Sequence, residues 1–284
     1  MPEPRDESAE AARRVTAIYN ATQTLHVDER AVSIGDLEPL ADRWKDEGTP
    51  SLQRQVAEVQ LENLRNGLVD PVFAALGKAL ANIPLTSFSL LDAACATGYY
   101  SEIIRHLDSR EIAYTGCDYS PAMIETARTH YPNLSFSVQD ITALGQPDRS
   151  YDVVLASGVL EHVPDFGKAI AQVCRVADAY VIVHRCPITS EPTHRHTIGS
   201  QYNIETPRTW FAKRPFLALF NEAGFDLAKA IPVHLPDIPS PRSDPLAWIR
   251  SRFNERRGGK RRSTTEVITF VFKRSRRPAP APKV

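Results

Sequence analysis

The chain has 284 residues, 42% of them hydrophobic and 24% charged, and its 34 Lys and Arg residues balance 34 Asp and Glu residues. This is an ordinary globular composition, and four cysteines are too few for a disulfide scaffold. Because the sequence has no CxxC pair, we expect no zinc–thiolate site. No apolar run approaches the roughly 20 residues of a transmembrane helix, and the acidic N-terminus lacks the apolar stretch of a secretory signal, so we expect a cytoplasmic protein.

The first 85 residues predict a helical extension. A weak helical pattern covers residues 9–20, and clearer helices are expected at 51–66, capped by its first serine, and at 71–81, which begins with proline. Four side chains of the 51–66 helix share a face at helical spacing: Leu52, Val56, Val59 and Asn63. With Tyr19 and Trp44, this extension is expected either to form a lid over a ligand or to cover a sheet edge.

Between residues 86 and 235, short apolar strands alternate with helices. We expect strands at 87–94, 113–117, 134–138, 151–156 and 179–184, and helices at 99–107, 121–130, 166–176 and 206–223. This alternation predicts a parallel sheet with helices on both faces. Two further strand candidates, at 225–235 and 265–273, are joined by a long loop instead of a helix, so we expect them to pair antiparallel at one sheet edge.

The C-terminal part differs in charge from the rest. Residues 236–284 hold 13 Lys and Arg against 4 Asp and Glu, whereas residues 1–235 hold 21 against 30. We divide it into a proline-rich and then basic loop at 236–263, a last core strand within 264–275 and a disordered tail at 276–284. The basic stretch 250–262 is the best candidate for binding an anionic partner.

Acidic residues follow three successive predicted strands. Asp92 ends the first strand, and small residues lead from it to the next helix, where free backbone N–H groups favour an anion. Asp118 ends the second strand, where a carboxylate can accept ribose hydroxyls, and Asp140 ends the third, where one can receive an adenine amino group. Ser157 follows the fourth strand. All lie at carboxyl ends of strands, where open α/β sheets bind ligands.

Four segments resemble, in order and at normal spacing, the motifs of class I S-adenosylmethionine-dependent methyltransferases: Leu91–Gly98, Tyr114–Ile124, Phe136–Ile141 and Tyr151–Asp165. The resemblance covers about a third of the chain. It implies an α/β, Rossmann-like, doubly wound and mostly parallel seven-stranded sheet with an antiparallel edge strand, here within 86–235 and 265–273. It also implies S-adenosyl-L-methionine as the cofactor.

The resemblance implies these cofactor-binding residues: Asp92, Ala94, Cys95, Ala96, Gly98, Asp118, Tyr119, Met123, Asp140, Ile141 and Ser157. The first acid and the loop after it would hold the methionine part, the second acid the ribose, and the later residues the adenine and the floor near the sulfonium. One departure is notable, because Ala94 and Ala96 stand where the family usually has glycine. The methyl group of Ala96 disfavours positive φ, so it is expected to weaken binding or to shift the loop.

Methyl transfer to oxygen usually needs a base, and His162 and His184 are the candidates, with a structural histidine as the alternative for each. The segment 185–205 is the expected acceptor pocket. In it, Arg185 or Arg195 would hold an acceptor carboxylate or phosphate, unless they are solvated loop charges. We expect no metal site, since two histidines at 194 and 196 lack a third ligand.

We therefore expect a methyltransferase for a small-molecule acceptor, with oxygen as the methyl-accepting atom, such as a sugar or a biosynthetic intermediate. No Asn/Asp-Pro-Pro-Tyr/Phe or Pro-Cys follows the fourth strand, which argues against amino groups of adenine or glutamine and against cytosine C5. Two alternatives stay open. One is a nucleic-acid methyltransferase that uses residues 250–262, and the other is a non-catalytic, nucleoside-binding protein with the same fold.

Overall fold

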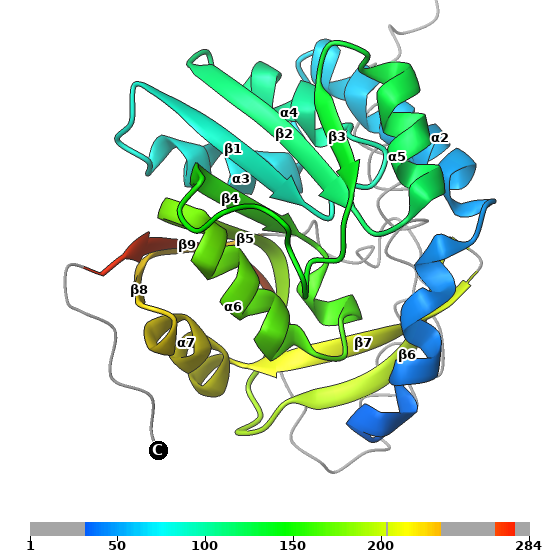
Figure 1. The fold of residues 1–284 in the computed structure, drawn as a ribbon, viewed down its shortest axis with the longest axis vertical. Coiled ribbons are helices and arrows are strands. Elements are labelled where there is room, and N and C mark those ends of the chain that lie inside the picture. Colours follow the sequence, from blue (N-terminus) through cyan, green and yellow to red (C-terminus); the bar gives the residue numbers. More distant parts are fainter. Residues whose placement is uncertain (1–31, 203, 234–264, 276–284) are drawn as a thin grey trace, which may run out of the picture.

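The computed structural model describes residues 32–202, 204–233 and 265–275, in which a central sheet has helices on both faces (Figure 1). The strands are β1 Ser87–Ala93, β2 Glu111–Asp118, β3 Ser135–Val138, β4 Tyr151–Ser157, β5 Ala177–Thr189, β6 Arg195–Gln201, β7 Ile204–Ala212, β8 Phe225–Pro232 and β9 Thr265–Arg274. The α-helices are α2 Thr49–Arg65, α3 Pro71–Ala81, α4 Tyr100–Leu107, α5 Pro121–His130, α6 Phe166–Val176 and α7 Lys213–Glu222. Three short 3₁₀-helices are η1 Ile34–Asp36, η2 Glu38–Lys45 and η3 Leu160–His162.

The sheet confirms the predicted fold class, but with β6 and β7 the described residues form nine strands instead of the predicted seven. Strands β3, β2, β1, β4 and β5 lie side by side in that order, and all pair in parallel. Beyond β5, the antiparallel strand β9 pairs with β5 on one side and with β8 on the other. Since β1 is followed in sequence by β2 on one side but lies against β4 on the other, the chain reverses its direction of winding between them. Ligands of open α/β sheets bind at such a point.

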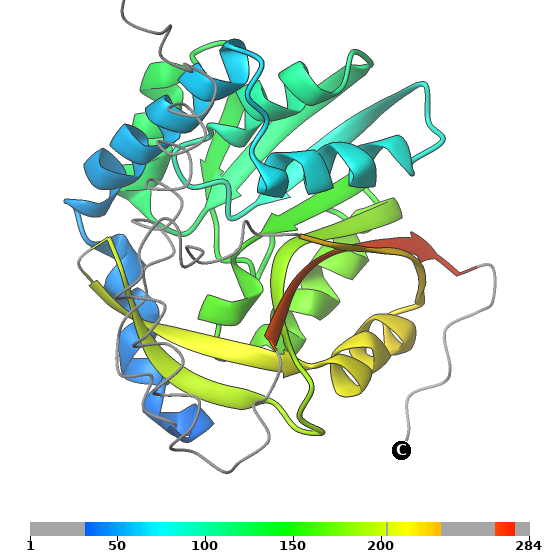
Figure 2. The ribbon, with the colours of Figure 1, turned by 180° about the vertical axis from the view of Figure 1, so that it is seen from behind.

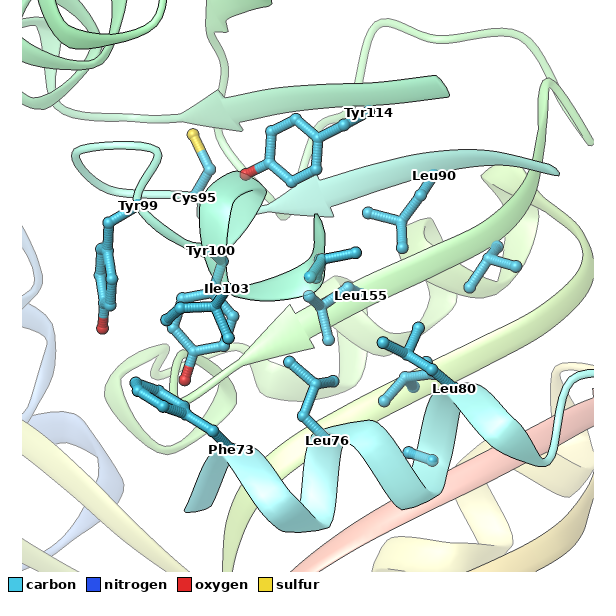
Figure 3. Packing of buried hydrophobic residues seen from close by; sticks show 14 of the residues in the cluster. Phe73, Leu76, Leu80, Leu90, Cys95, Tyr99, Tyr100, Ile103, Tyr114 and Leu155 are labelled. Atoms are coloured by element: carbon cyan, nitrogen blue, oxygen red, sulfur yellow. The ribbon is translucent and has the colours of Figure 1, made fainter. Parts of the chain in front are cut away.

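Neighbouring residues in the strands supply two hydrophobic cores, one on each face. Leu90 packs toward α2, α3, α4 and α5, whereas Leu91 packs toward α6 and α7, because successive side chains of a strand point to opposite faces. Figure 3 shows the first core, with Leu76 and Leu80 of α3 pointing toward the sheet and Leu155 of β4. Both faces are thus buried, which accounts for the continuous apolar runs of these strands.

Most predicted helices have the expected bounds, and the caps show why. Helix α5 begins after Ser120, whose Oγ accepts a hydrogen bond from the N–H of Met123 at 3.4 Å. The prediction for α2 was wrong in detail, because this helix begins at Thr49 and Ser51 does not cap it. Its buried face is also rotated by about one residue from the predicted one and consists of Gln53, Ala57, Leu61 and Leu64.

The prediction of one helix over 206–223 was wrong. Residues 204–212 form β7, which pairs antiparallel with β6, and only Lys213–Glu222 is helical. Burial in β7 alternates around Thr209 and Phe211, which is the period of a strand, and β6 supplies the hydrogen-bonding partner. Strand β5 also extends five residues beyond its predicted end and joins the hairpin through residues 188 and 189.

The β6–β7 hairpin reaches away from the sheet and lies beside η2, as both views show (Figures 1 and 2). Strand β7 also packs against η3, which follows β4. The hairpin and η2 thus stand together next to the carboxyl end of the sheet. None of the helices in the described ranges is long and apolar enough to cross a membrane. The predictions for residues 9–20, Tyr19, 236–263 and 276–284 lie outside the described residues.

Candidate active site

Two adjoining pockets open at the carboxyl ends of β1, β2, β3 and β4. The larger has a volume of about 540 Å³ and the smaller about 100 Å³. They share four lining residues, which are Trp44, Ala94, Tyr119 and His162. The shared residues come from η2, the loop after β1, the end of β2 and η3, so the predicted motifs and the N-terminal extension meet here.

Asp92 lies at the end of β1 with only 1% of its surface exposed. Its Oδ2 accepts a hydrogen bond of 2.6 Å from the hydroxyl of Tyr114, whereas its buried Oδ1 has no hydrogen-bond partner. Burial raises the pKa of Asp92 to about 7; the bond from Tyr114 opposes this rise, and the charge of Asp118 adds to it. The smaller pocket therefore contains a carboxyl group with unused capacity to accept a hydrogen bond or to meet a cation.

The loop after β1 keeps a glycine-like backbone at two alanines. Ala94 has φ 72° and Ala96 has φ 49°, and Gly98 has φ 76°. The N–H groups of Ala94 and Cys95 both donate to the carbonyl oxygen of Cys117, at 2.7 and 2.9 Å. The methyl groups therefore do not divert the loop, and the strain of the left-handed conformation is held by the neighbouring strand.

Asp118 connects this loop to the start of α5. Its two carboxylate oxygens accept hydrogen bonds from the N–H groups of Ala96 and Ser120, at 3.0 and 2.9 Å. Burial raises the pKa of Asp118 to about 6, against the effect of these bonds. The residue predicted to bind a ribose thus also positions the backbone of the cofactor loop.

The residues predicted for the adenine side lie along the larger pocket. Tyr119, Asp140 and Ile141 line it, and the hydroxyl of Tyr119 donates to the carbonyl oxygen of Ala41 in η2 at 2.5 Å. Asp140 is exposed and holds the turn after β3 through the N–H of the second residue after it, at 2.7 Å. Met123 is buried and lines the smaller pocket.

The two candidate bases occupy different environments. His162 lines both pockets, and its Nδ1 lies 2.8 Å from the carbonyl oxygen of Pro207. Burial lowers the pKa of His162 to about 3, so its imidazole is neutral. His184 is fully buried, bonds Thr269 through Nδ1 at 2.7 Å and lines neither pocket, so it does not face the crevice as the sequence led us to expect.

Ser157 lines the smaller pocket, as predicted, together with residues from the segment 185–205 that was expected to build the acceptor pocket. Arg185 lies on this wall, and Tyr202 stands beside it. Arg195 instead packs 5.1 Å from the ring centroid of Trp210 on the hairpin. The described ranges contain no group of three or more His, Cys, Asp or Glu side chains arranged to hold a metal ion.

Sequence reasoning missed several residues of the site. Gln53 of α2 accepts a hydrogen bond from the N–H of Thr97 at 3.1 Å, and Tyr99 lines the smaller pocket. Gln53 could have been found as a polar residue on the otherwise apolar buried face of α2, but the predicted buried face was shifted and did not include it. Tyr202 lies within the segment 185–205 that was expected to build the acceptor pocket, whereas Pro207 carried no signal, because the hairpin that positions it was not predicted.

Comparison with known proteins agrees with this geometry. A sequence model of a methyltransferase domain family matches residues 86–224. The trans-aconitate 2-methyltransferase of Methylobacterium radiotolerans is 35% identical over 121 residues, which are 41% of this chain and 45% of that protein. The ubiquinone biosynthesis O-methyltransferase of Methylobacterium nodulans is 29% identical over 147 residues, 50% of this chain and 56% of that one. The chain thus matches about half the length of these curated relatives.

A solved S-adenosylmethionine-dependent methyltransferase from Clostridium acetobutylicum has the same fold, with a TM-score of 0.51 and 14% identity over 79% of this chain and 99% of that chain. The family match spans the four motifs identified in the sequence. Residues 86–224 therefore form a class I S-adenosylmethionine-dependent methyltransferase domain.

Proposed function

We propose that this protein transfers a methyl group from S-adenosyl-L-methionine to an oxygen atom of a small-molecule acceptor. The observation that carries the proposal is the convergence of all four motif segments on two adjoining pockets. The names of the relatives from both Methylobacterium species support methyl transfer, and one of them specifies an O-methyltransferase. The oxygen acceptor is part of the proposal, since the chain matches only about half the length of those relatives.

The residues present fit the cofactor. The buried Oδ1 of Asp92 has no partner, so it suits the positively charged amino group of the cofactor's methionine part. Ala94 and Ala96 have the left-handed backbone conformation that glycine usually adopts, so the loop keeps its glycine-like course. We assign the larger pocket to the adenine, between Tyr119 and Ile141. When bound, the cofactor supplies an electrophilic methyl group on a sulfonium.

His162 is the residue we assign to the acceptor hydroxyl. A carbonyl oxygen only accepts hydrogen bonds, so the short contact with Pro207 fixes the proton of the imidazole on Nδ1 and leaves a lone pair on Nε2. Because the pKa of His162 is lowered to about 3, this nitrogen is a weak base. It therefore suits an acceptor hydroxyl that is itself acidic, such as a phenol or an enol, and it orients that hydroxyl by accepting its hydrogen bond.

The N-terminal extension acts in this proposal as a lid. Trp44 of η2 lines both pockets, and its ring lies 5.0 Å from that of His162 in an edge-to-face arrangement. A lid that excludes water strengthens the electrostatic interactions within the site. We also propose a cytoplasmic location, which is supported by four buried cysteines that are all free thiols.

The test is calorimetric titration of the purified protein with S-adenosylmethionine and with S-adenosylhomocysteine, followed by a screen of phenols, enols and hydroxy acids for methylation. Micromolar binding of both and turnover of at least one hydroxyl compound would support the proposal. Binding without turnover on any acceptor class would instead favour a non-catalytic nucleoside-binding protein. Failure of both ligands to bind would overturn the cofactor assignment.

A further inference from the structure

Arg185 enters the smaller pocket from an irregular point of β5. Its φ is 60°, which is a left-handed conformation that a non-glycine residue rarely adopts. The pairing of β5 with β9 shifts register between Val183 and Cys186, so Arg185 sits in a bulge. Bulges redirect side chains, and strained residues cluster at functional sites, because the surrounding structure must hold them there. The strand is thus distorted where it turns this arginine toward the pocket.

The guanidinium of Arg185 forms no ion pair at contact distance among the described residues. Its Nε is buried without a hydrogen-bond partner, and none of the ion pairs in the described ranges includes it. It lies within electrostatic range of Glu161, Asp92 and Asp70, yet burial raises the pKa of each of these carboxyl groups and so favours its neutral form. Arginine stays charged in proteins, so this buried charge has no carboxylate in contact with it, which is costly unless a ligand pairs with it.

Aromatic groups and one glycine hold the guanidinium in place. Its Cζ lies 6.0 Å from the ring centroid of Tyr100, and the phenols of Tyr99 and Tyr202 are also near. A Cβ atom at Gly158 would lie 2.9 Å from Cζ of Arg185, so a larger residue at this position would displace the guanidinium. The guanidinium is thus surrounded by aromatic rings and the backbone at Gly158, and it faces the smaller pocket.

A second unpaired donor lines the same pocket. The indole Nε1 of Trp44 is buried and has no hydrogen-bond partner, and Trp44 packs 6.1 Å from the ring of Tyr202. Buried donors are nearly always satisfied in folded proteins, so two unsatisfied donors on one pocket point to a ligand that brings acceptor atoms. A carboxylate is an acceptor with two oxygens and a single charge.

From these contacts we infer that the methyl acceptor is a carboxylic acid whose carboxylate pairs with Arg185. This inference rests on the proposed function and specifies the class of its acceptor. The carboxylate anchors the molecule, while its hydroxyl oxygen takes the methyl group beside His162. No bond to the anchoring group forms or breaks, since an ion pair and hydrogen bonds hold it.

The charge balance of the pocket favours a carboxylate over a phosphate. Arg185 is the only Lys or Arg among the described residues that line the smaller pocket, whereas Asp92 and Asp118 both line it. One guanidinium neutralises one negative charge, and a phosphate group carries close to two at neutral pH. The second charge of a phosphate would meet no further Lys or Arg among the described residues of this pocket, so a monoanion matches the site better.

The experiment compares acetate with acetamide, which has nearly the same size and shape but no charge. Saturation-transfer NMR would detect each probe at millimolar concentration and constant ionic strength, with and without saturating S-adenosylhomocysteine. We expect a signal for acetate that is at least fivefold stronger than that for acetamide. Arg185→Met should reduce the acetate signal to the acetamide level, and Arg185→Lys should retain part of it. Trp44→Phe keeps the ring, removes the N–H and should weaken the signal.

Arg65→Met is the matched control, because Arg65 is a half-exposed arginine paired with Glu102 outside the pocket, and it should leave the signal unchanged. Equal signals for acetate and acetamide, or an acetate signal that survives Arg185→Met, would overturn the inference. Inorganic phosphate binding in preference to acetate would overturn the carboxylate assignment.

Calorimetry with S-adenosylhomocysteine on the same variants separates this inference from the proposed function. We expect Arg185→Met to bind it within threefold of the wild type. A loss of more than tenfold would place Arg185 in the cofactor site and overturn the inference. Absence of binding to the wild type would count against the proposed function, whereas the acetate comparison reports on Arg185 alone.

Discussion

The imidazole Nδ1 of His162 lies 2.8 Å from the carbonyl oxygen of Pro207, and this hydrogen bond ties η3 to the β6–β7 hairpin. One contact therefore does two things. It fixes the tautomer of a histidine that lines both pockets, and it attaches the hairpin to the parallel sheet. Substitutions at His162 can separate these two effects, because the amide of asparagine overlays Nδ1 and nothing replaces Nε2.

We predict that His162→Asn retains thermal stability but loses about 100-fold in turnover, as expected for removal of a group that assists proton transfer. His162→Ala should lose the same turnover and also stability, on the order of 1 kcal/mol, because the Pro207 carbonyl loses its partner. Both variants should bind S-adenosylhomocysteine normally. Thermal unfolding, calorimetry and initial rates measure the three quantities, and wild-type turnover in His162→Asn would reduce the residue to a structural role.

Asp92 should make stability depend on pH. Its pKa is about 7 in the folded protein and near 3.8 when unfolded, so the folded state binds more protons between these values. Its contribution to stability is fully present below about pH 4 and is lost as the pH rises through 7. Asp92→Asn cannot ionise at this position. Between pH 5 and pH 8, we therefore expect its free energy of unfolding to rise by roughly 3 kcal/mol relative to that of the wild type. Denaturant titrations at both pH values measure this gap, and an equal gap would contradict the assignment.

Asp118→Ala should affect both the cofactor and the fold. The N–H groups of Ala96 and Ser120 would lose their acceptor, which costs about 2 kcal/mol of unfolding free energy. We also expect at least a tenfold loss of affinity for S-adenosylhomocysteine. Asp118→Asn, which keeps one acceptor oxygen, should lose less stability. Calorimetry that shows unchanged affinity in Asp118→Ala would refute its place in the cofactor site.

The strained alanine predicts a stabilising substitution. Ala96→Gly relieves a φ of 49°, and we expect it to raise the unfolding free energy by about 0.5–1 kcal/mol after the added entropy of the unfolded chain is counted. Gly98→Ala is the opposite case, because its Cβ would lie 2.9 Å from ring atoms of Phe136 at a φ of 76°. It should cost about 2 kcal/mol. Urea unfolding of both variants checks the pair, and a destabilised Ala96→Gly would argue against strain at this loop.

Local patterns in the sequence accounted for the sheet, most helices and the order of the motif residues. The mostly apolar strand Ser87–Ala93 and the helix start at Ser120 and Pro121 are decided within a few neighbouring residues, which is why their bounds agree with the structure. The positions of Asp92, Asp118 and Ser157 at the carboxyl ends of parallel strands follow from the alternation of strands and helices alone. Their convergence was therefore predictable without coordinates.

The tertiary structure decided what depends on partners far apart in sequence. Residues 206–212 have side chains that suit helix or strand, and only pairing with β6 makes them a strand. Arg185 was indistinguishable from a solvated loop charge until the bulge in β5 and the space above Gly158 placed it in a pocket where it forms no ion pair with another described residue. The pattern of residues determines local conformation. Burial and charge compensation depend instead on which distant segments meet, and they set the chemistry of the smaller pocket.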